Sequence, residues 1–270
     1  MSGSDFFNQN IESNTPSKLN NKLRTIGIIS GKGGTGKTTA TINLCAAIQT
    51  FNQNVIAVDT DVKMSGLGLH LGFYNPKFTL NNVLKEDTSL LEAIHIHPTG
   101  IRFIPASLKP ENLDLSKLGE MLEKYIPYNS IVLLDSPPGL EENFIQVLEN
   151  CSEVLVVTTP DIQSITNSIK VLEEAKRRGV KPIGVILNRY KSENKKLAES
   201  LEDIFGVPLI GIIPEDPFLQ RSSLKGTPSI FLKPHSRSSR EFKKIASRIL
   251  GIQYKPRITD KIMGIFRGLL

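Results

Sequence analysis

The chain has 270 residues, 39% hydrophobic and 22% charged, the composition of a globular protein that can bury a sizeable core. It shows no run of about 18 apolar residues and no signal-peptide pattern at its start. Its only two cysteines, Cys45 and Cys151, lie apart in apolar settings, which indicates reduced core thiols. We therefore expect a cytoplasmic protein. The net charge of +6 is uneven, because residues 221–270 alone sum to +10, which indicates a polyanionic partner, membrane or nucleic acid, unless the basic residues only keep the protein soluble.

Residues 1–22 are rich in Asn, Ser and Gln and predict a disordered tail, because they offer too little apolar surface to offset the entropy of ordering. Beyond them, apolar β-branched runs alternate with helical patterns. The predicted strands cover residues 25–30, 54–59, 100–105, 130–135, 153–158, 182–188 and 208–214. The predicted helices cover residues 38–51, 115–125, 141–150, 164–178, 194–205 and 238–250. This alternation predicts one α/β domain over residues 23–250, with helices on both faces of a doubly wound, mainly parallel sheet.

The first predicted strand runs into a glycine-rich loop and then a helix. Gly31, Gly36, Lys37 and Thr38 have Walker A spacing, in which glycines let backbone N–H groups point at phosphates and the helix N-terminus adds a favourable field. Lys37 is predicted to bind the β- and γ-phosphates, Thr38 to ligate Mg²⁺ and Thr39 to donate to the α-phosphate. The predicted phosphate loop comprises Gly31, Lys32, Gly33, Gly34, Thr35, Gly36, Lys37, Thr38 and Thr39. The sequence therefore predicts binding and hydrolysis of ATP with Mg²⁺.

Residues 32–39 read KGGTGKTT, which resembles the deviant Walker A loop of the MinD/ParA family of P-loop ATPases. The resemblance implies the P-loop NTPase fold and a homodimer in the ATP state. It also implies that Lys32 reaches the phosphates of the partner subunit, where a second cation would neutralise charge on the transferred phosphoryl group. The alternative is that Lys32 is a solvated loop lysine.

Two predicted strands end in aspartates, at the edge where parallel sheets bind ligands. Asp59 is predicted to hold water on the magnesium, and Asp61 to orient the attacking water, as the corresponding aspartate does in the family. Asp135 ends the Walker B pattern SIVLLD and is predicted to act on magnesium through water. Residues 135–139, DSPPG, resemble the DxPxG motif of the family, which implies that the Pro-Pro-Gly turn forms the second switch. The predicted catalytic residues are Lys32, Lys37, Asp61 and Asp135, and the predicted metal site is Thr38, Asp59 and Asp135.

Two later strand ends resemble the adenine-contacting positions of the family. An asparagine amide can both donate to and accept from the edge of adenine. The predicted base site comprises Asn188, Arg189, Pro214, Glu215 and Asp216. By contrast, residues 65–69 carry glycines where the MinD branch usually has Asn and Asp, so we expect the first switch to recognise a different partner. The alternating pair His95 and His97 lacks a third metal ligand nearby, and we interpret both as strand-edge residues.

Residues 251–270 form a basic, amphipathic C-terminal segment. Basic residues and glycines take much of one side of a helix drawn through this segment, and MinD proteins end in a similar one. The predicted membrane-binding face comprises Ile258, Ile262, Ile265, Phe266 and Leu269. We predict peripheral association with an anionic membrane, strengthened when an ATP-state dimer brings two anchors. A last helix packed on the domain is the alternative.

The preferred interpretation is a MinD-like ATPase, a dimerising switch that hydrolyses ATP to ADP and phosphate slowly, is stimulated by an activating protein and positions a division or cellular structure. The alternative is a ParA-like partition ATPase that binds DNA non-specifically through basic patches such as residues 176–179. The apolar terminal face favours the first, because DNA binding does not require it. A metal-cluster carrier is disfavoured because no CxxC pattern is present, and a non-catalytic adaptor is disfavoured by the lysines and aspartates above.

Overall fold

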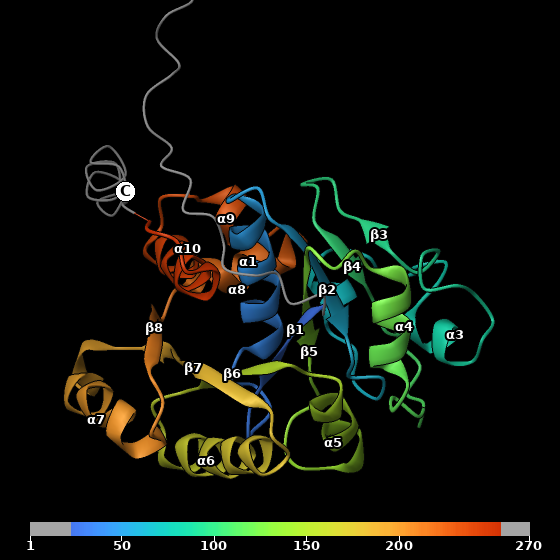
Figure 1. The fold of residues 1–270 in the computed structure, drawn as a ribbon. Helices are drawn as coiled ribbons and strands as arrows, with labels where there is room; N and C mark the ends of the chain where they lie inside the picture. The colour runs from blue at the N-terminus through green and yellow to red at the C-terminus, as the bar shows by residue number, and fades with distance from the viewer. Residues whose placement is uncertain (1–22, 255–270) are drawn as a thin grey trace, which may run out of the picture.

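The structure, a computed structural model, describes residues 23–254 (Figure 1). One sheet has the strand order β3-β4-β2-β5-β1-β6-β7-β8, with every neighbouring pair parallel except β3 with β4. The strands are β1 (Arg24–Ile29), β2 (Asn54–Asp59), β3 (His95–Ile96), β4 (Arg102–Ile104), β5 (Ser130–Asp135), β6 (Glu153–Thr158), β7 (Lys181–Tyr190) and β8 (Leu209–Pro214). The prediction of a mainly parallel α/β sheet is confirmed, and the short antiparallel edge strand β3 is added to it.

Helices cover both faces of this sheet (Figure 1). One face packs against α1 (Lys37–Gln49), α2 (Leu67–His70), α8 (Pro217–Leu224), α9 (Ser229–Leu232) and α10 (Arg237–Leu250). The other packs against α3 (Leu80–Leu84), α4 (Leu118–Tyr125), α5 (Glu142–Glu149), α6 (Ile162–Arg177) and α7 (Lys195–Phe205), with a 3-10 turn at Ser192–Asn194 before α7. All six predicted helices are present, whereas α2, α3, α8 and α9 were not predicted. Within residues 23–254 no helix has the length and apolar character to cross a bilayer.

Strand β5 shows why the central strands are unbroken apolar runs. Ile131 and Leu133 belong to the core beneath α1, whereas Val132 and Leu134 belong to the core on the opposite face. Because both faces of the strand are covered, the side chains that point to either face must be apolar. Each such side chain contributes about 1.5–3 kcal/mol when it is fully buried.

Helix α1 is buried along most of its length between the sheet and α10. This explains its even apolar composition, which lacks the one-sided pattern of a surface helix. The free thiol of Cys45 lies in this helix, and burial raises its pKa to about 12. Cys151 is also free and is half-buried. The phosphate loop is therefore joined to one of the most enclosed helices of the domain.

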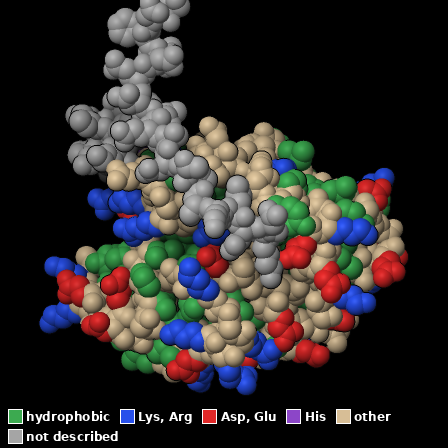
Figure 2. All heavy atoms as spheres, in the orientation of Figure 1, with side chains coloured by type: hydrophobic (Ala, Val, Ile, Leu, Met, Phe, Trp, Pro, Cys, Tyr) green, Lys and Arg blue, Asp and Glu red, His purple; other side chains and the backbone are tan. Residues whose placement is uncertain are grey.

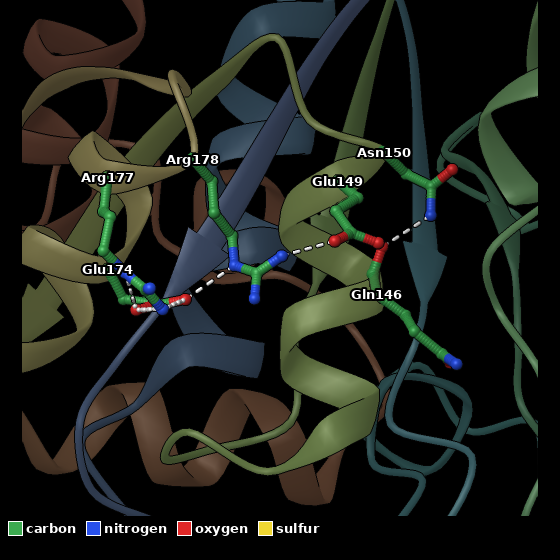
Figure 3. Close-up of polar contacts among 6 residues, drawn as sticks. All are labelled: Gln146, Glu149, Asn150, Glu174, Arg177 and Arg178. Atoms are coloured by element: carbon green, nitrogen blue, oxygen red, sulfur yellow. Dashed lines mark hydrogen bonds and ion pairs between the residues drawn. The ribbon is translucent and has the colours of Figure 1, made fainter.

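A network of polar side chains joins the ends of α5 and α6 (Figure 3). Arg178 donates from Nε to Glu174 Oε1 at 2.6 Å and from Nη1 to Glu149 of α5. Asn150 ends α5, donating from Nδ2 to the Gln146 carbonyl at 2.6 Å. Such exposed ion pairs contribute about 0–1 kcal/mol each, so this network adds little to the stability of the domain. The space-filling view shows positively and negatively charged side chains scattered over one face of the molecule (Figure 2).

Candidate functional site

The loop between β1 and α1 lies near the middle of the sheet, where β1 is flanked by β5 and β6. Gly34 and Gly36 have φ of +76° and +93°, a backbone conformation that favours glycine. Gly36 is also the N-cap of α1, so the first N–H groups of the helix face the loop. A Cβ built on Gly33 or Gly34 would meet no atom within 4 Å. The loop thus offers open space beside backbone donors and a helix N-terminus, which suits an anion such as phosphate.

Two neighbouring elements hold the outside of the loop. A Cβ on Gly31 would lie 2.2 Å from the carbonyl oxygen of Asn167 in α6, and one on Gly36 would lie 2.3 Å from Nδ2 of Asn188. That same Nδ2 donates to the carbonyl of Thr35 at 2.7 Å. The curvature of the loop therefore depends on α6 on one side and on the end of β7 on the other.

We expect Gly31→Ala to destabilise the fold and Gly33→Ala to leave it nearly unchanged. The added methyl group at Gly31 overlaps α6 backbone, which cannot rotate aside, and overpacking of this kind costs about 1–3 kcal/mol. For a domain of this size that lowers Tm by roughly 2–10 °C. Thermal unfolding followed by circular dichroism measures the difference. Equal Tm values for the two variants would contradict the tight contact.

The predicted metal-binding carboxylates lie side by side. Asp59 and Asp135 end the adjacent strands β2 and β5 and are direct partners in the register. Both are buried. Asp59 Oδ2 accepts hydrogen bonds from Ser65 Oγ and from the backbone N–H groups of Gly66 and Leu67, at 2.9–3.1 Å. The site thus holds one carboxylate with three fixed donors beside a second on the next strand.

Asp135 is tied to α1 by two hydroxyl groups. Thr38 Oγ1 donates to Asp135 Oδ2 at 2.6 Å, and Thr41 Oγ1 lies 3.1 Å from Asp135 Oδ1. Thr41 was not predicted, although its position three residues after Thr38 places it on the same helix face. Ser65 was also missed, because only a turn in the backbone brings it back to Asp59.

The charges of this cluster do not balance within the chain. Burial and, after it, the neighbouring Asp135 raise the pKa of Asp59 to about 7, against the three hydrogen-bond donors. Burial also raises the pKa of Asp135, against the Lys37 ammonium and the threonine hydroxyls. Burial lowers the pKa of Lys37, while Asp135, Asp61 and Asp59 oppose that change. One lysine therefore faces three carboxylates. A hydroxyl and carboxylates are the hard oxygen ligands that suit Mg²⁺, and a divalent cation would restore the balance.

We expect Asp59→Asn to stabilise the nucleotide-free, metal-free protein at high pH. The folded pKa of Asp59 lies above its ordinary value of 3.8, so the folded state holds the proton more tightly. Stability contributed by this group is therefore present below about pH 4 and is lost as pH rises toward 7. Asparagine keeps an oxygen for the three donors and carries no charge, so its Tm should exceed that of the unmodified chain at pH 8 and not at pH 4.

The measurement is thermal unfolding in EDTA at pH 4 and pH 8. Asp87→Asn, which removes an exposed aspartate, serves as the matched control. If the difference in Tm between the two pH values were the same in Asp59→Asn and in the unmodified chain, burial of the Asp59 charge would not be the cause.

The two lysines of the loop lie in different surroundings. Lys37 is only 8% exposed and faces the carboxylates, whereas Lys32 is exposed on the outer side of the loop. The Lys32 ammonium lies 3.7 Å from Asp161 Oδ1 and 3.4 Å from Gln163 Oε1, at the N-terminus of α6. The predicted role of Lys32 toward a second subunit stays a prediction, and its exposed position leaves it accessible to one.

Asp61 follows the buried carboxylate of Asp59 by two residues. Its backbone N–H donates to Asp59 Oδ1 at 3.2 Å, and its own Oδ1 accepts from the Met64 N–H at 2.9 Å. The side chain is half-buried. These bonds hold Asp61 at the border between the buried carboxylates and solvent, where a water molecule has access.

A cavity of about 920 Å³ adjoins the loop. Gly36 and Thr39 line it from the loop side. The predicted base residues Asn188, Arg189, Pro214, Glu215 and Asp216 also line it. The structure thus brings together residues from both ends of the predicted nucleotide site. Their contacts with adenine stay a prediction.

Two of these residues also have structural partners. Asp216 caps α8 by accepting from the Phe218 N–H at 2.9 Å, and it accepts a hydrogen bond from Ser238. Asn188 Oδ1 accepts from the Arg189 N–H at 2.9 Å, which leaves its amide one N–H and one lone pair for a ligand.

The five predicted membrane residues from Ile258 to Leu269 lie outside the described residues, as does the predicted tail at residues 1–22.

Comparison with known proteins places this geometry among nucleotide-binding proteins. Residues 26–230 match the family described as the CobQ/CobB/MinD/ParA nucleotide binding domain. An uncharacterised ATP-binding protein of Methanocaldococcus jannaschii is 34% identical over 240 residues, which cover 87% of this chain and 91% of that protein. The crystal structure of the cell division ATPase MinD of Pyrococcus furiosus superposes with a TM-score of 0.80 at 36% identity, covering 84% of this chain and 98% of that one. The septum site-determining protein MinD of Pyrococcus horikoshii, complexed with Mg-ADP, gives 0.79 and 35%, covering 90% and 98%.

Proposed function

Since the chain belongs to the CobQ/CobB/MinD/ParA nucleotide-binding family, we propose that it is a nucleotide-timed switch whose ATP-bound copies pair and then associate with a membrane. The chain is a MinD-like ATPase, and it uses Mg²⁺ with its nucleotide, as the similar structure with Mg-ADP indicates. Pairing, membrane association and the structure that the switch positions are the parts that we propose.

The described residues divide the ATPase chemistry among themselves. Backbone N–H groups of the loop and Lys37 bind the phosphates, and Thr38, Asp59 and Asp135 would hold Mg²⁺, directly or through water. Bound magnesium supplies positive charge that neutralises the phosphate oxygens as the bond to the leaving group breaks. Asp61 accepts a hydrogen bond from the attacking water and orients it, so this aspartate need not be a strong base.

The placement of Lys32 is the observation that carries the proposal of pairing. Its ammonium lies outside its own phosphate cradle, against Asp161 at the start of α6. In a pair of facing chains, this exposed cation would add positive charge to the partner's phosphates, where it is worth most in the transition state. ATP would thereby favour the pair, and hydrolysis would weaken it. Each pair carries two terminal segments, so membrane residence follows the nucleotide state.

Liposome pelleting tests this proposal. The full chain, a chain ending at residue 256 and Lys32→Ala are each mixed with phosphatidylglycerol vesicles in ATP or ADP. We expect the full chain to pellet with ATP several-fold more than with ADP, because one short anchor alone binds only marginally. Both altered proteins should lose the ATP-dependent fraction, whereas Lys181→Ala, which removes another exposed lysine, should keep it.

Two outcomes would contradict the proposal. Unchanged pelleting of the shortened chain would show that residues 257–270 are not the anchor. ATP-dependent binding to DNA fragments in place of vesicles would favour the partition ATPase interpretation.

A further inference from the structure

The cavity beside the phosphate loop has a second wall that the predicted nucleotide site does not include. Helix α2 with the loop after it, and the last turn of α8, form this wall. Two large side chains stand on it and are strongly exposed, Tyr74 at 64% and Leu224 at 83%. They line the same cavity as the predicted base residues, which come from the ends of β7 and β8.

A pair of glycines fixes the two halves of this wall to each other. A Cβ on Gly226 would lie 2.9 Å from Gly72 Cα, and both glycines have positive φ, +61° and +77°. Tyr74 follows Gly72 by two residues, and Leu224 precedes Gly226 by two. Two segments distant in sequence therefore touch at this point, and Tyr74 from one and Leu224 from the other both line the cavity close to the contact.

Phe73 anchors the loop that carries Tyr74. Its N–H donates to the Gly68 carbonyl at 2.9 Å, and its ring lies edge-on to Phe103 with 4.9 Å between centroids. On the other side of the contact, His97 donates from Nε2 to the Gly226 carbonyl at 2.8 Å, since its Nδ1 already accepts from the Thr99 N–H. Tyr74 is thus presented by a braced backbone, so little conformational freedom is lost when a ligand packs on it.

We propose that Tyr74 and Leu224 form an apolar clamp on the base of the bound adenine nucleotide, a role that rests on the nucleotide site proposed above. The Tyr74 ring stacks on one face of the base, and Leu224 covers the adjoining apolar surface. Aromatic side chains stack on any planar base, and burying two exposed apolar groups removes them from water. The segment that carries Tyr74 starts at the Gly66 and Leu67 N–H groups that donate to Asp59, so the base contact and the buried carboxylates share one stretch of chain.

The proposed clamp contacts the base and does not contact the phosphates. Its contribution can therefore be measured separately from phosphate binding. We expect Tyr74→Ala to weaken ATP and ADP binding about tenfold in calorimetry, on the scale of an aromatic–base stack. Binding of inorganic tripolyphosphate should change less than about twofold. Tyr74→Phe should restore nucleotide affinity, Leu224→Ala should weaken it less than Tyr74→Ala, and Tyr128→Ala, which removes another exposed tyrosine outside the cavity, should have no effect.

Tyrosine fluorescence provides a second test, which does not depend on a change in nucleotide affinity. The chain has five tyrosines and no tryptophan, so tyrosine emission can be followed directly. ADP should quench the emission of the unmodified chain and of Tyr128→Phe, and this change should disappear in Tyr74→Phe although ADP still binds. Unchanged ATP affinity in Tyr74→Ala, equal loss of ATP and tripolyphosphate binding, or quenching that persists in Tyr74→Phe would overturn the clamp alone. An unmodified chain that bound no ATP would overturn the proposed function and the clamp together.

Discussion

Replacing Lys37 with alanine should lower kcat/KM for ATP by at least about a hundredfold, the scale of removing a fixed positive group from a phosphoryl-transfer site. Lys37 is 8% exposed and is placed with its charge against the ends of β2 and β5. Water that entered the space left by the Lys37 ammonium would not stabilise the phosphate charge as well. The ammonium is already fixed in position, whereas water molecules would first have to reorient. Steady-state phosphate release gives the ratio, and Lys63→Ala, an exposed lysine near the same strand ends, is the control.

The same variant should also destabilise the nucleotide-free chain. Without Lys37, the buried carboxylates of Asp59 and Asp135 lose the cation that faces them, and an uncompensated buried charge costs several kcal/mol. Lys37→Ala combined with Asp59→Asn should recover part of the lost Tm at pH 8 and none of the activity. Recovery of activity in the double variant would mean that Lys37 acts only by balancing charge in the fold.

Asp61→Ala should lower kcat by about a hundredfold or more while leaving the affinity for ATP within a few-fold. The side chain holds the turn after β2 through the Met64 N–H, and its remaining oxygen is the group that we assign to the water. Asp61→Asn keeps an oxygen for Met64 and replaces the other acceptor by an N–H donor. Both variants should therefore bind ATP and fail to hydrolyse it, which would hold pairs together in size-exclusion chromatography.

Single-turnover hydrolysis and ATP binding, measured on the same preparations, distinguish an effect on the rate of hydrolysis from an effect on the affinity for ATP. Glu141→Gln removes an exposed carboxylate near Lys63 and should leave both quantities unchanged. Hydrolysis by Asp61→Ala at the rate of the unmodified chain would remove the water-orienting role. Loss in Asp61→Ala with full activity in Asp61→Asn would show that the side chain only shapes the turn.

The elements that the sequence predicted and those that it missed differ in length. The apolar runs at residues 54–59, 130–135 and 153–158 correspond residue for residue to β2, β5 and β6. Helices α2 and α9 have four residues each, about one turn, which is too short to show a helical period. Helix α8 could have been found, because Asp216 and Pro217 form a recognised start signal. Strand β3 has two residues, so the alternation of its side chains carries no signal.

The sequence by itself determined the phosphate loop, because its glycines, Lys37 and Thr38 act within one short stretch where spacing sets geometry. It also determined the mainly parallel sheet, because strands covered on both faces must be apolar throughout. Only the tertiary structure decided which distant groups meet. The register of β2 with β5 places Asp59 beside Asp135, and Thr38 donates to Asp135 across 97 positions of the chain. The contact of Gly72 with Gly226 likewise builds the second wall of the base cavity. Such long-range contacts depend on how the elements pack against one another, and the spacing of residues along one element does not predict them.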